Sequence, residues 1–379
     1  MGHNRLKQLS ALGQSVWYDY IRRDLYTGPT LGRLIAEDGL SGMTSNPTIF
    51  QKAIADTDLY DEDIRRQGRT GGEPARVFEA LAVEDVRHAA DAFRPTYEAT
   101  GGNDGFVSIE VGPHLAHDTD GTIAEARRLW QACDRPNVMV KIPGTRAGLP
   151  AIHQCLIEGI NINVTLLFSI DRYKDVMEAY LSAAESRLAK QQPVDRMRSV
   201  ASFFVSRVDT NTDALLAAIA KDGTRPAADR ALVETLRGRT GIANARLAYA
   251  VFERTFATPR AQGLEARGMA VQRPLWASTS TKDPAYPDLY YVEALVGPDS
   301  VDTMPPETYD AYKDHGEPTV RIHDDLDAAR ATFDGLRQLG LDLSRITQTL
   351  EDEGVKKFAD SYDALLKAVA AKMKAVGVA

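Results

Sequence analysis

The sequence predicts an α/β fold, a (β/α)8 TIM barrel, on three observations. Short apolar runs alternate with long helix-like stretches over about 280 residues, which is the scale of this barrel. Eight such runs can be counted, the number of strands that the barrel requires. The nucleotide-binding patterns G-x-G-x-x-G and G-x-x-x-x-G-K-[ST] do not occur, which disfavours the competing doubly wound open sheet.

The expected strands are apolar segments rich in β-branched and aromatic residues. In chain order they span 15–19, 39–45, 105–111, 137–143, 162–168, 199–206, 273–279 and 290–296. Helical periodicity separates them over 75–96, 121–134, 146–159, 171–191 and 225–257. Residues 324–378 read as two amphipathic helices packed outside the barrel. We therefore expect a single barrel domain over 1–379, with about 324–379 as a C-terminal helical extension.

Composition excludes several classes of partner. The net charge is −8, and no basic stripe with interleaved aromatic residues is present, so no nucleic-acid partner is expected. No apolar run reaches the length of a membrane span, and the N-terminus lacks the apolar core of a secretory signal. The two cysteines, Cys133 and Cys155, are too few for a disulfide framework. These features predict a cytoplasmic globular protein without a membrane partner.

Polar residues fall on one face of several expected strands. In 161–168, Asn163 and Thr165 alternate with Ile162, Val164, Leu166 and Phe168, which are expected to face the helices. The polar positions come late in their strands, toward the end where barrel enzymes keep their active sites. An antiparallel sheet half exposed to water would give similar alternation, but the long intervening helices disfavour it. A lumenal pocket is thus expected to gather Glu110, Lys141, Asn163, Thr165 and Ser202.

Lys141 is the most unusual of these residues, because it interrupts the apolar run "NVMVKIPGT". Burying an ammonium group is costly, so this lysine must be neutralised or used. A neutral lysine amine can attack a ketone or aldehyde to form a Schiff base. That chemistry needs one carboxylate for carbinolamine dehydration and another at a substrate hydroxyl, which Glu110 and Asp19 could supply. Alternatively, Asp19 forms a structural ion pair with Arg22 or Arg23.

Five segments resemble the signatures of transaldolases, most closely those of the longer bacterial form. They are "SGMTSNPTIF" (41–50), "VKIPGT" (140–145), "EGININVTLLFS" (158–169), "RPLWASTSTKDP" (273–284) and "DTMPPETYDAY" (302–312). The resemblance implies a (β/α)8 barrel of the class I aldolase type with a Schiff-base lysine on its fourth strand, and no metal or organic cofactor. It also implies the pentose phosphate pathway reaction: transfer of a dihydroxyacetone unit from sedoheptulose 7-phosphate or fructose 6-phosphate to glyceraldehyde 3-phosphate or erythrose 4-phosphate. Its sugar-phosphate substrates would be small molecules.

The resemblance also implies a role for each matching residue. Lys141 would be the nucleophile, Asp19 the acid/base at the C4 hydroxyl, and Glu110 with Thr165 the holders of a catalytic water. The residues expected to bind or line the dihydroxyacetone unit are Asn46, Asn163, Thr44, Ser202 and Phe204.

The phosphate end departs from the family pattern. Arg207 and Ser278 match the family's phosphate-binding residues. The short transaldolases place a second arginine soon after that serine, whereas this chain offers Lys282. Lysine binds phosphate as a point charge and lacks the bidentate fork of arginine, which leaves the role of Lys282 open.

Several alternatives stay open. A fructose 6-phosphate aldolase of the same superfamily would use the same lysine but release free dihydroxyacetone. A non-catalytic sugar-phosphate-binding barrel would keep Arg207 and Ser278 without needing a neutral lysine. A pyridoxal-phosphate enzyme also uses lysine, but two carboxylates and substrate-facing asparagines fit a sugar better. Relatives can be fused to glucose-6-phosphate isomerase, so association with a sugar-phosphate isomerase is a further expectation.

Overall fold

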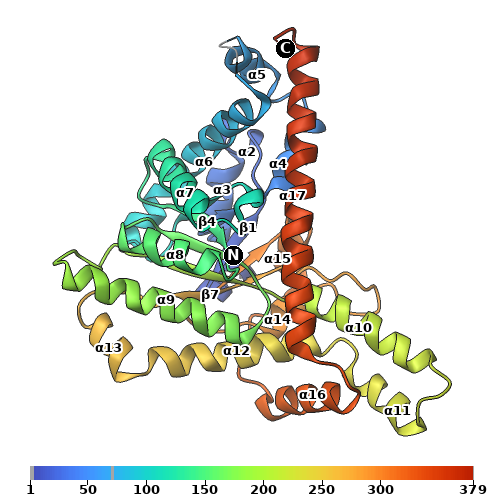
Figure 1. Cartoon of the computed structure of the whole chain (residues 1–379). Coiled ribbons are helices and arrows are strands. Elements are labelled where there is room, and N and C mark those ends of the chain that lie inside the picture. Colours follow the sequence, from blue (N-terminus) through green and yellow to red (C-terminus); the bar gives the residue numbers. More distant parts are fainter. Residues whose placement is uncertain (1–3, 70–71, 379) are drawn as a thin grey trace.

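A computed structural model describes residues 4–69 and 72–378 (Figure 1). Eight parallel strands close into a barrel. Each strand is hydrogen-bonded to the next, and β8 closes the ring against β1. The strands are β1 Gln14–Asp19, β2 Gly42–Thr44, β3 Phe106–Glu110, β4 Val138–Pro143, β5 Ile162–Leu167, β6 Ser199–Phe204, β7 Arg273–Ala277 and β8 Ser300–Met304. The predicted (β/α)8 barrel is confirmed.

Helices fill the connections between strands and form the outer layer. They are α1 Arg5–Ala11, α2 Asp24–Thr27, α3 Thr30–Arg33, η1 Leu34–Asp38, α4 Pro47–Ala55, α5 Asp61–Gly68, α6 Pro74–Ala99, η2 Pro113–Leu115, α7 Thr119–Cys133, α8 Gly148–Ile157, α9 Ile170–Ala189, α10 Ser206–Lys221, α11 Ala227–Leu236, α12 Thr240–Phe256, α13 Pro259–Glu265, α14 Tyr290–Ala294, α15 Pro306–His315, α16 Leu326–Gln338 and α17 Leu343–Ala375. The stretch predicted over 225–257 is two helices, because Gly238 takes a left-handed φ of +66° between α11 and α12.

The eighth strand was predicted at the wrong place. Residues 290–296 contain the helix α14, and β8 lies further along the chain. The buried residues of that segment, Tyr291, Val292, Leu295 and Val296, recur with a spacing of four, which a helical turn satisfies as well as a short strand does. The true strand is hidden because Asp302 and Thr303 interrupt its apolar pattern. Asp302 is tolerated there because its Oδ1 accepts a hydrogen bond of 2.9 Å from Thr279 Oγ1.

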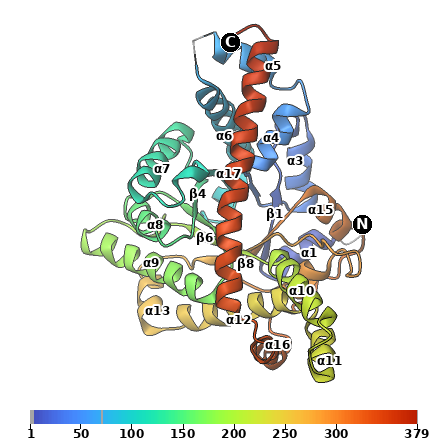
Figure 2. The same cartoon turned by 45° about the vertical axis from the view of Figure 1, so that its right-hand side comes forward.

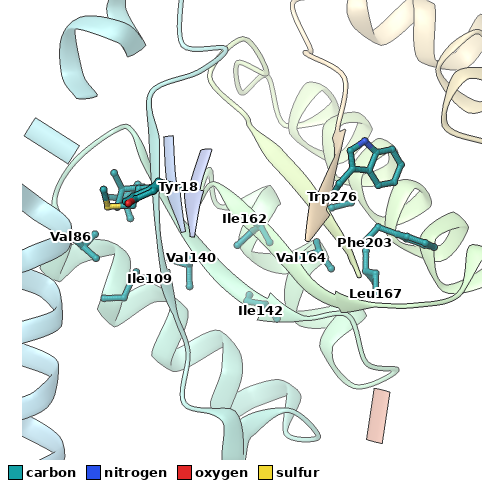
Figure 3. Close-up of a cluster of buried hydrophobic side chains, with 14 of the residues drawn as sticks. Tyr18, Val86, Ile109, Val140, Ile142, Ile162, Val164, Leu167, Phe203 and Trp276 are labelled. Atoms are coloured by element: carbon teal, nitrogen blue, oxygen red, sulfur yellow. The ribbon is translucent and has the colours of Figure 1, made fainter. Parts of the chain in front are cut away.

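The two faces of each strand meet different surroundings. One face packs against the helices, as Figure 3 shows for Ile109, Val140, Ile142, Ile162 and Val164. The opposite face fills the lower lumen with Trp17, Phe106, Met139, Val200, Leu275 and Val301. A Cβ atom at Gly42 would lie 2.5 Å from the Trp17 ring, so only glycine fits beside this side chain. The alternation predicted from the sequence is therefore present in most strands.

Strand β5 is the exception, and here the predicted faces of Leu166 and Phe168 are wrong. The pairing with β6 shifts register between Val164 and Leu167, and Leu166 has a φ of +59°. This bulge turns Leu167 toward the helix layer and brings Leu166 and Phe168 into the apolar cluster that also holds Phe204. Strict alternation predicts faces only where the ladder is regular.

The two predicted C-terminal helices, α16 and α17, are both present. Helix α17 runs past α4, α5 and α6 at one end and reaches α10 at the other (Figure 2). Its Gly354 lies against Leu166, where a Cβ atom would come within 3.0 Å of Leu166 Cδ2. The helix therefore reaches the carboxyl end of β5. Within residues 4–69 and 72–378, no helix has both the length and the apolarity that a membrane crossing requires.

Candidate active site

Lys141 lies inside the barrel near the carboxyl end of β4, with only 6% of its side chain exposed. It shares its strand face with Met139, which belongs to the lumenal cluster. Its Nζ atom donates a 2.9 Å hydrogen bond to the main-chain oxygen of Ser45. A carbonyl oxygen offers this amine a partner without neutralising it by a full negative charge.

The Ser45 oxygen is available because strands β2 and β3 separate. Their ladder pairs only Gly42 with Phe106 and Met43 with Val107, whereas β3 and β4 stay in register up to Glu110 and Lys141. Beyond the ladder, Ser45 Oγ donates a 2.8 Å hydrogen bond to the Ser108 oxygen. A fork between β2 and β3 thus opens toward the carboxyl end of the barrel.

Glu110 faces Lys141 from the neighbouring strand, with Oε2 3.6 Å from Nζ and 6% of its side chain exposed. Neither carboxylate oxygen has a hydrogen-bond partner in the described part of the chain, and the same is true of Thr165 Oγ1 on β5. Burial raises the pKa of Glu110 to about 7, against the opposing effect of the Lys141 charge. A carboxyl group with this pKa can both give and take a proton near neutral pH.

Asp19 ends β1 and takes its hydrogen bond from Thr44 of β2, over 2.6 Å between Thr44 Oγ1 and Oδ1. The single hydroxyl hydrogen of Thr44 is donated to Asp19. In the 2.7 Å hydrogen bond between Thr44 Oγ1 and Thr303 Oγ1, Thr303 is therefore the donor. Burial raises the pKa of Asp19, while Lys141, the Thr44 hydrogen bond and Arg207 oppose the rise.

The alternative ion pair for Asp19 is wrong within the described residues. Arg22 pairs with Asp24, and Arg23 pairs with Asp63, Glu84 and Asp85. The Asp19 carboxylate therefore pairs with neither arginine and can act in the lumen of the barrel.

The asparagines are held by their neighbours in defined orientations. Asn163 Oδ1 accepts a 2.6 Å hydrogen bond from Ser202 Oγ, and its Nδ2 donates over 3.0 Å to Ser108 Oγ. Asn46 Oδ1 caps helix α4 by accepting from the Ile49 amide over 3.0 Å. Each amide keeps donor capacity for a ligand, because an Nδ2 group carries two hydrogens.

Arg207 occupies the first turn of α10, above the ring of Phe204 at 5.0 Å from its centroid. No carboxylate lies within ion-pair distance of its guanidinium in residues 4–69 and 72–378, and burial lowers its pKa. Ser278 lies next to this turn: its Oγ is 3.0 Å from Ser206 Oγ, and its main-chain oxygen accepts from the Ser206 amide. A buried cation at the N-terminus of a helix is a suitable place for an anionic group.

Lys282 approaches the same region from the loop after β7. Its Nζ is 2.5 Å from Ser280 Oγ, and burial lowers its pKa. Arg207 and Lys357 act in the same direction as burial, whereas Glu307 opposes them. Lysine 357 belongs to α17, so the C-terminal helix brings a further positive charge close to this group.

The sequence-predicted residues therefore gather at one end of the barrel, on seven different strands or the loops that follow them. Three contributors were not predicted: the main-chain oxygen of Ser45, the hydroxyl of Thr303 and the charge of Lys357. A main-chain oxygen leaves no signal in the residue types. Thr303 lies in the strand whose position was misassigned, and its parity with Val301 would have revealed it.

The chain is similar to known proteins over nearly its whole length. The family model described as Transaldolase/Fructose-6-phosphate aldolase matches residues 16–369. Proteins named Transaldolase from Frankia alni and Thermobifida fusca are each 48% identical over 373 residues, covering 98% of both chains. A protein named Transaldolase 2 from Nostoc punctiforme is 43% identical over 376 residues, covering 99% of both chains.

Proposed function

The chain belongs to the Transaldolase/Fructose-6-phosphate aldolase family, and from this premise we propose that it transfers a dihydroxyacetone unit through a Schiff base on Lys141. The observation that carries the proposal is the environment of this lysine, which is buried, bonded to a neutral carbonyl oxygen and faced by Glu110 at 3.6 Å. The donor is a ketose phosphate such as fructose 6-phosphate or sedoheptulose 7-phosphate, and the acceptor is an aldose phosphate.

The reaction begins when the amine of Lys141 attacks the C2 carbonyl of the ketose. Glu110, with its pKa near neutrality, moves the protons of carbinolamine dehydration through a water shared with Thr165. The protonated imine then draws electrons from the C3–C4 bond, and Asp19 accepts the proton of the C4 hydroxyl as the aldose leaves. Addition of the acceptor aldehyde and imine hydrolysis reverse these steps.

The remaining groups position the sugar. The free amide hydrogens of Asn46 and Asn163 donate to the dihydroxyacetone hydroxyls, and Ser202 supports Asn163 through its 2.6 Å hydrogen bond. Thr44 orients Asp19. The phosphate binds beside Arg207 and Ser278, with Lys282 as a second, monodentate cation. The three-carbon enamine stays bound until an acceptor arrives, so positioning is a large part of the catalysis.

Reductive trapping tests the proposal directly. Borohydride added with fructose 6-phosphate should attach a dihydroxyacetone- or hexose-derived adduct to the peptide that contains Lys141, and Lys141→Ala should remove both the adduct and turnover. With erythrose 4-phosphate as acceptor, sedoheptulose 7-phosphate should be the main product. Free dihydroxyacetone as the main product would instead favour the aldolase reaction, and an adduct on another lysine would contradict the assignment of Lys141.

A further inference from the structure

A small side pocket opens from the fork between β2 and β3 and extends outward between helices. Its lining includes Asn46 and Glu110 on the barrel side, Phe78 and Ala82 of α6, Glu125 of α7 and Tyr362 of α17. The cavity volume is about 40 Å³. A buried water needs roughly 10–15 Å³ measured in this way, so the pocket has room for about three waters and none for a sugar.

The wall of the side pocket includes both buried residues of β3 and partly exposed residues of the surrounding helices. Glu110 forms part of the buried side of this wall, and its two carboxylate oxygens are buried and lack hydrogen-bond partners among the described residues. At its outer end are Glu79 and Glu125, whose side chains are 31% and 25% exposed and which both lie near Arg128. Glu125 Oε1 also accepts the Gly112 amide over 2.9 Å. Polar residues therefore occur on both the buried and the partly exposed sides of the wall, where waters can find hydrogen-bond partners.

The position of the side pocket separates it from the phosphate end of the site. In the closed ring, the β2–β3 fork lies diametrically opposite the β6–β7 side that carries Arg207 and Ser278, with β3 to β6 on one side and β7, β8, β1 and β2 on the other. A sugar phosphate bound to Lys141 and extending toward Arg207 occupies the barrel mouth, with its dihydroxyacetone end beside Asn46, and leaves free the side pocket, which is too small for a sugar.

Schiff-base chemistry must move water while the mouth is occupied. When the neutral amine forms the imine, the C2–O bond breaks and the oxygen leaves with the two amine hydrogens as one water. Hydrolysis consumes one water and restores the carbonyl and the amine, so each complete transfer releases one water and takes up one. The fork lies next to the atoms involved, because Lys141 donates to Ser45 at its edge and Glu110 forms part of the pocket wall.

We infer that the side pocket is the route by which this water leaves and re-enters the site, with Glu110 at its inner end and Phe78 at its rim. This inference rests on the proposed Schiff-base function. Phe78 is half-buried and lies between two rings, with its centroid 5.5 Å from that of Phe50 and 5.9 Å from that of Tyr362. Its size therefore sets the width of the outer opening.

Exchange of ¹⁸O between the C2 carbonyl of fructose 6-phosphate and solvent, without acceptor, measures the passage of this water. Lys141→Ala gives the uncatalysed background. Phe78→Trp, which narrows the rim far from the lysine, and Ala82→Leu, which fills the pocket, should each lower the catalysed exchange by roughly fivefold or more. Ala90→Leu is the matched control, since Ala82 and Ala90 are 2% and 0% exposed on the same helix but only Ala82 lines the pocket. Phe78→Ala, which widens the rim, should not slow exchange.

The amount of borohydride-trapped adduct at equilibrium should be unchanged in Phe78→Trp, since a narrower route alters rates and not the imine equilibrium. Wild-type exchange in both Phe78→Trp and Ala82→Leu would overturn the inference and leave the Schiff-base function intact. Equal losses in Ala82→Leu and Ala90→Leu, with wild-type exchange in Phe78→Trp, would also overturn it. If Ala82→Leu does not fold, Phe78→Trp against Phe78→Ala decides. Absence of exchange and adduct in the wild-type protein would instead refute the proposed function.

Discussion

Glu110 and Lys141 are register partners on β3 and β4, yet their charged atoms stay 3.6 Å apart because Lys141 Nζ bonds to the Ser45 oxygen. The pair attracts without a close hydrogen bond, so both carboxylate oxygens remain open to other donors. An amine that must become a nucleophile is thus kept near its proton acceptor without being locked to it.

Asp19→Asn should separate imine formation from bond cleavage. The amide cannot accept the C4 hydroxyl proton, so cleavage should fall by roughly 10²–10⁴-fold, the usual contribution of a general base. Borohydride should still trap a six-carbon adduct from fructose 6-phosphate on Lys141. Mass spectrometry of the trapped peptide checks this, and a predominantly three-carbon adduct in the variant would remove Asp19 from its role.

Glu110→Gln should abolish the change in the rate of imine hydrolysis that the wild-type protein is expected to show near pH 7. In the wild-type protein, Glu110 takes up a proton as pH falls through about 7 and can then no longer accept one from water. Lys141 and Asp19 are the charged groups that act on it, in opposite directions. Hydrolysis rates measured from pH 5 to 9 in Glu110→Gln should be flat in this region and lower by roughly 10²–10⁴-fold at pH 8. If the pH dependence of the hydrolysis rate persists unchanged in Glu110→Gln, it belongs to another titrating group.

Asp302→Asn provides a matched comparison for stability. Burial raises the pKa of Glu110 from 4.5, and of Asp302 from 3.8, to about 7 in each case. The folded state then binds more protons than the unfolded state between the lower and the higher value, so both groups lower stability as pH rises through this window. The melting temperatures of Glu110→Gln and Asp302→Asn should therefore exceed that of the wild type, and the difference should be larger at pH 8 than at pH 4. Asp302 faces the helix layer, and its variant should keep the wild-type activity profile.

Arg207→Gln should weaken binding of phosphorylated sugars selectively. Loss of charge-assisted hydrogen bonds costs about 1.5–3 kcal/mol, or roughly a 10- to 150-fold rise in KM for fructose 6-phosphate. Turnover of unphosphorylated fructose or dihydroxyacetone, which makes no such contact, should change much less. An equal loss with both classes of substrate would show that Arg207 supports the fold of the site and not the phosphate.

Gly42→Ala should destabilise the barrel because its Cβ atom would meet the Trp17 ring at 2.5 Å. The ring cannot move easily, since Trp17 Nε1 donates a 2.7 Å hydrogen bond to Asp104. We expect a loss of about 1–3 kcal/mol in the free energy of unfolding, measured by urea denaturation. Gly263→Ala in α13, where no atom lies within 4 Å of the new Cβ, is the control and should stabilise slightly. Equal stability of the two variants would contradict the packing argument.

The sequence was informative where the barrel is regular. Seven of its strands were placed correctly because their apolar faces must meet the helix layer, and the polar positions 110, 141 and 163 therefore predicted the lumen. The same reasoning failed at Leu166, because a left-handed residue in β5 reverses the faces beyond it. Nothing in the residue type announces this bulge, since leucine seldom adopts a positive φ.

The eighth strand shows a different limit. "YYVEALV" has the composition of a strand but forms α14, while "SVDTM" carries a buried carboxyl group and forms β8. The tertiary partner of Asp302, the Thr279 hydroxyl, satisfies one of its buried carboxylate oxygens, and the sequence around Asp302 does not reveal it. The fork between β2 and β3 was unpredictable for the same reason, because it depends on where a ladder stops and not on which residues it contains.

Helix α17 fixes the distance between two of its contacts with the rest of the protein. Gly354 meets Leu166 near β5, and Tyr362 lies over the side pocket beside α6. Gly354 and Tyr362 are eight residues apart, about 12 Å along the helix axis. One residue inserted between them would rotate Tyr362 by about 100° about the helix axis relative to Gly354, so one of the two contacts would be lost. Changes of chain length during divergence should therefore avoid this interval and accumulate in the loops.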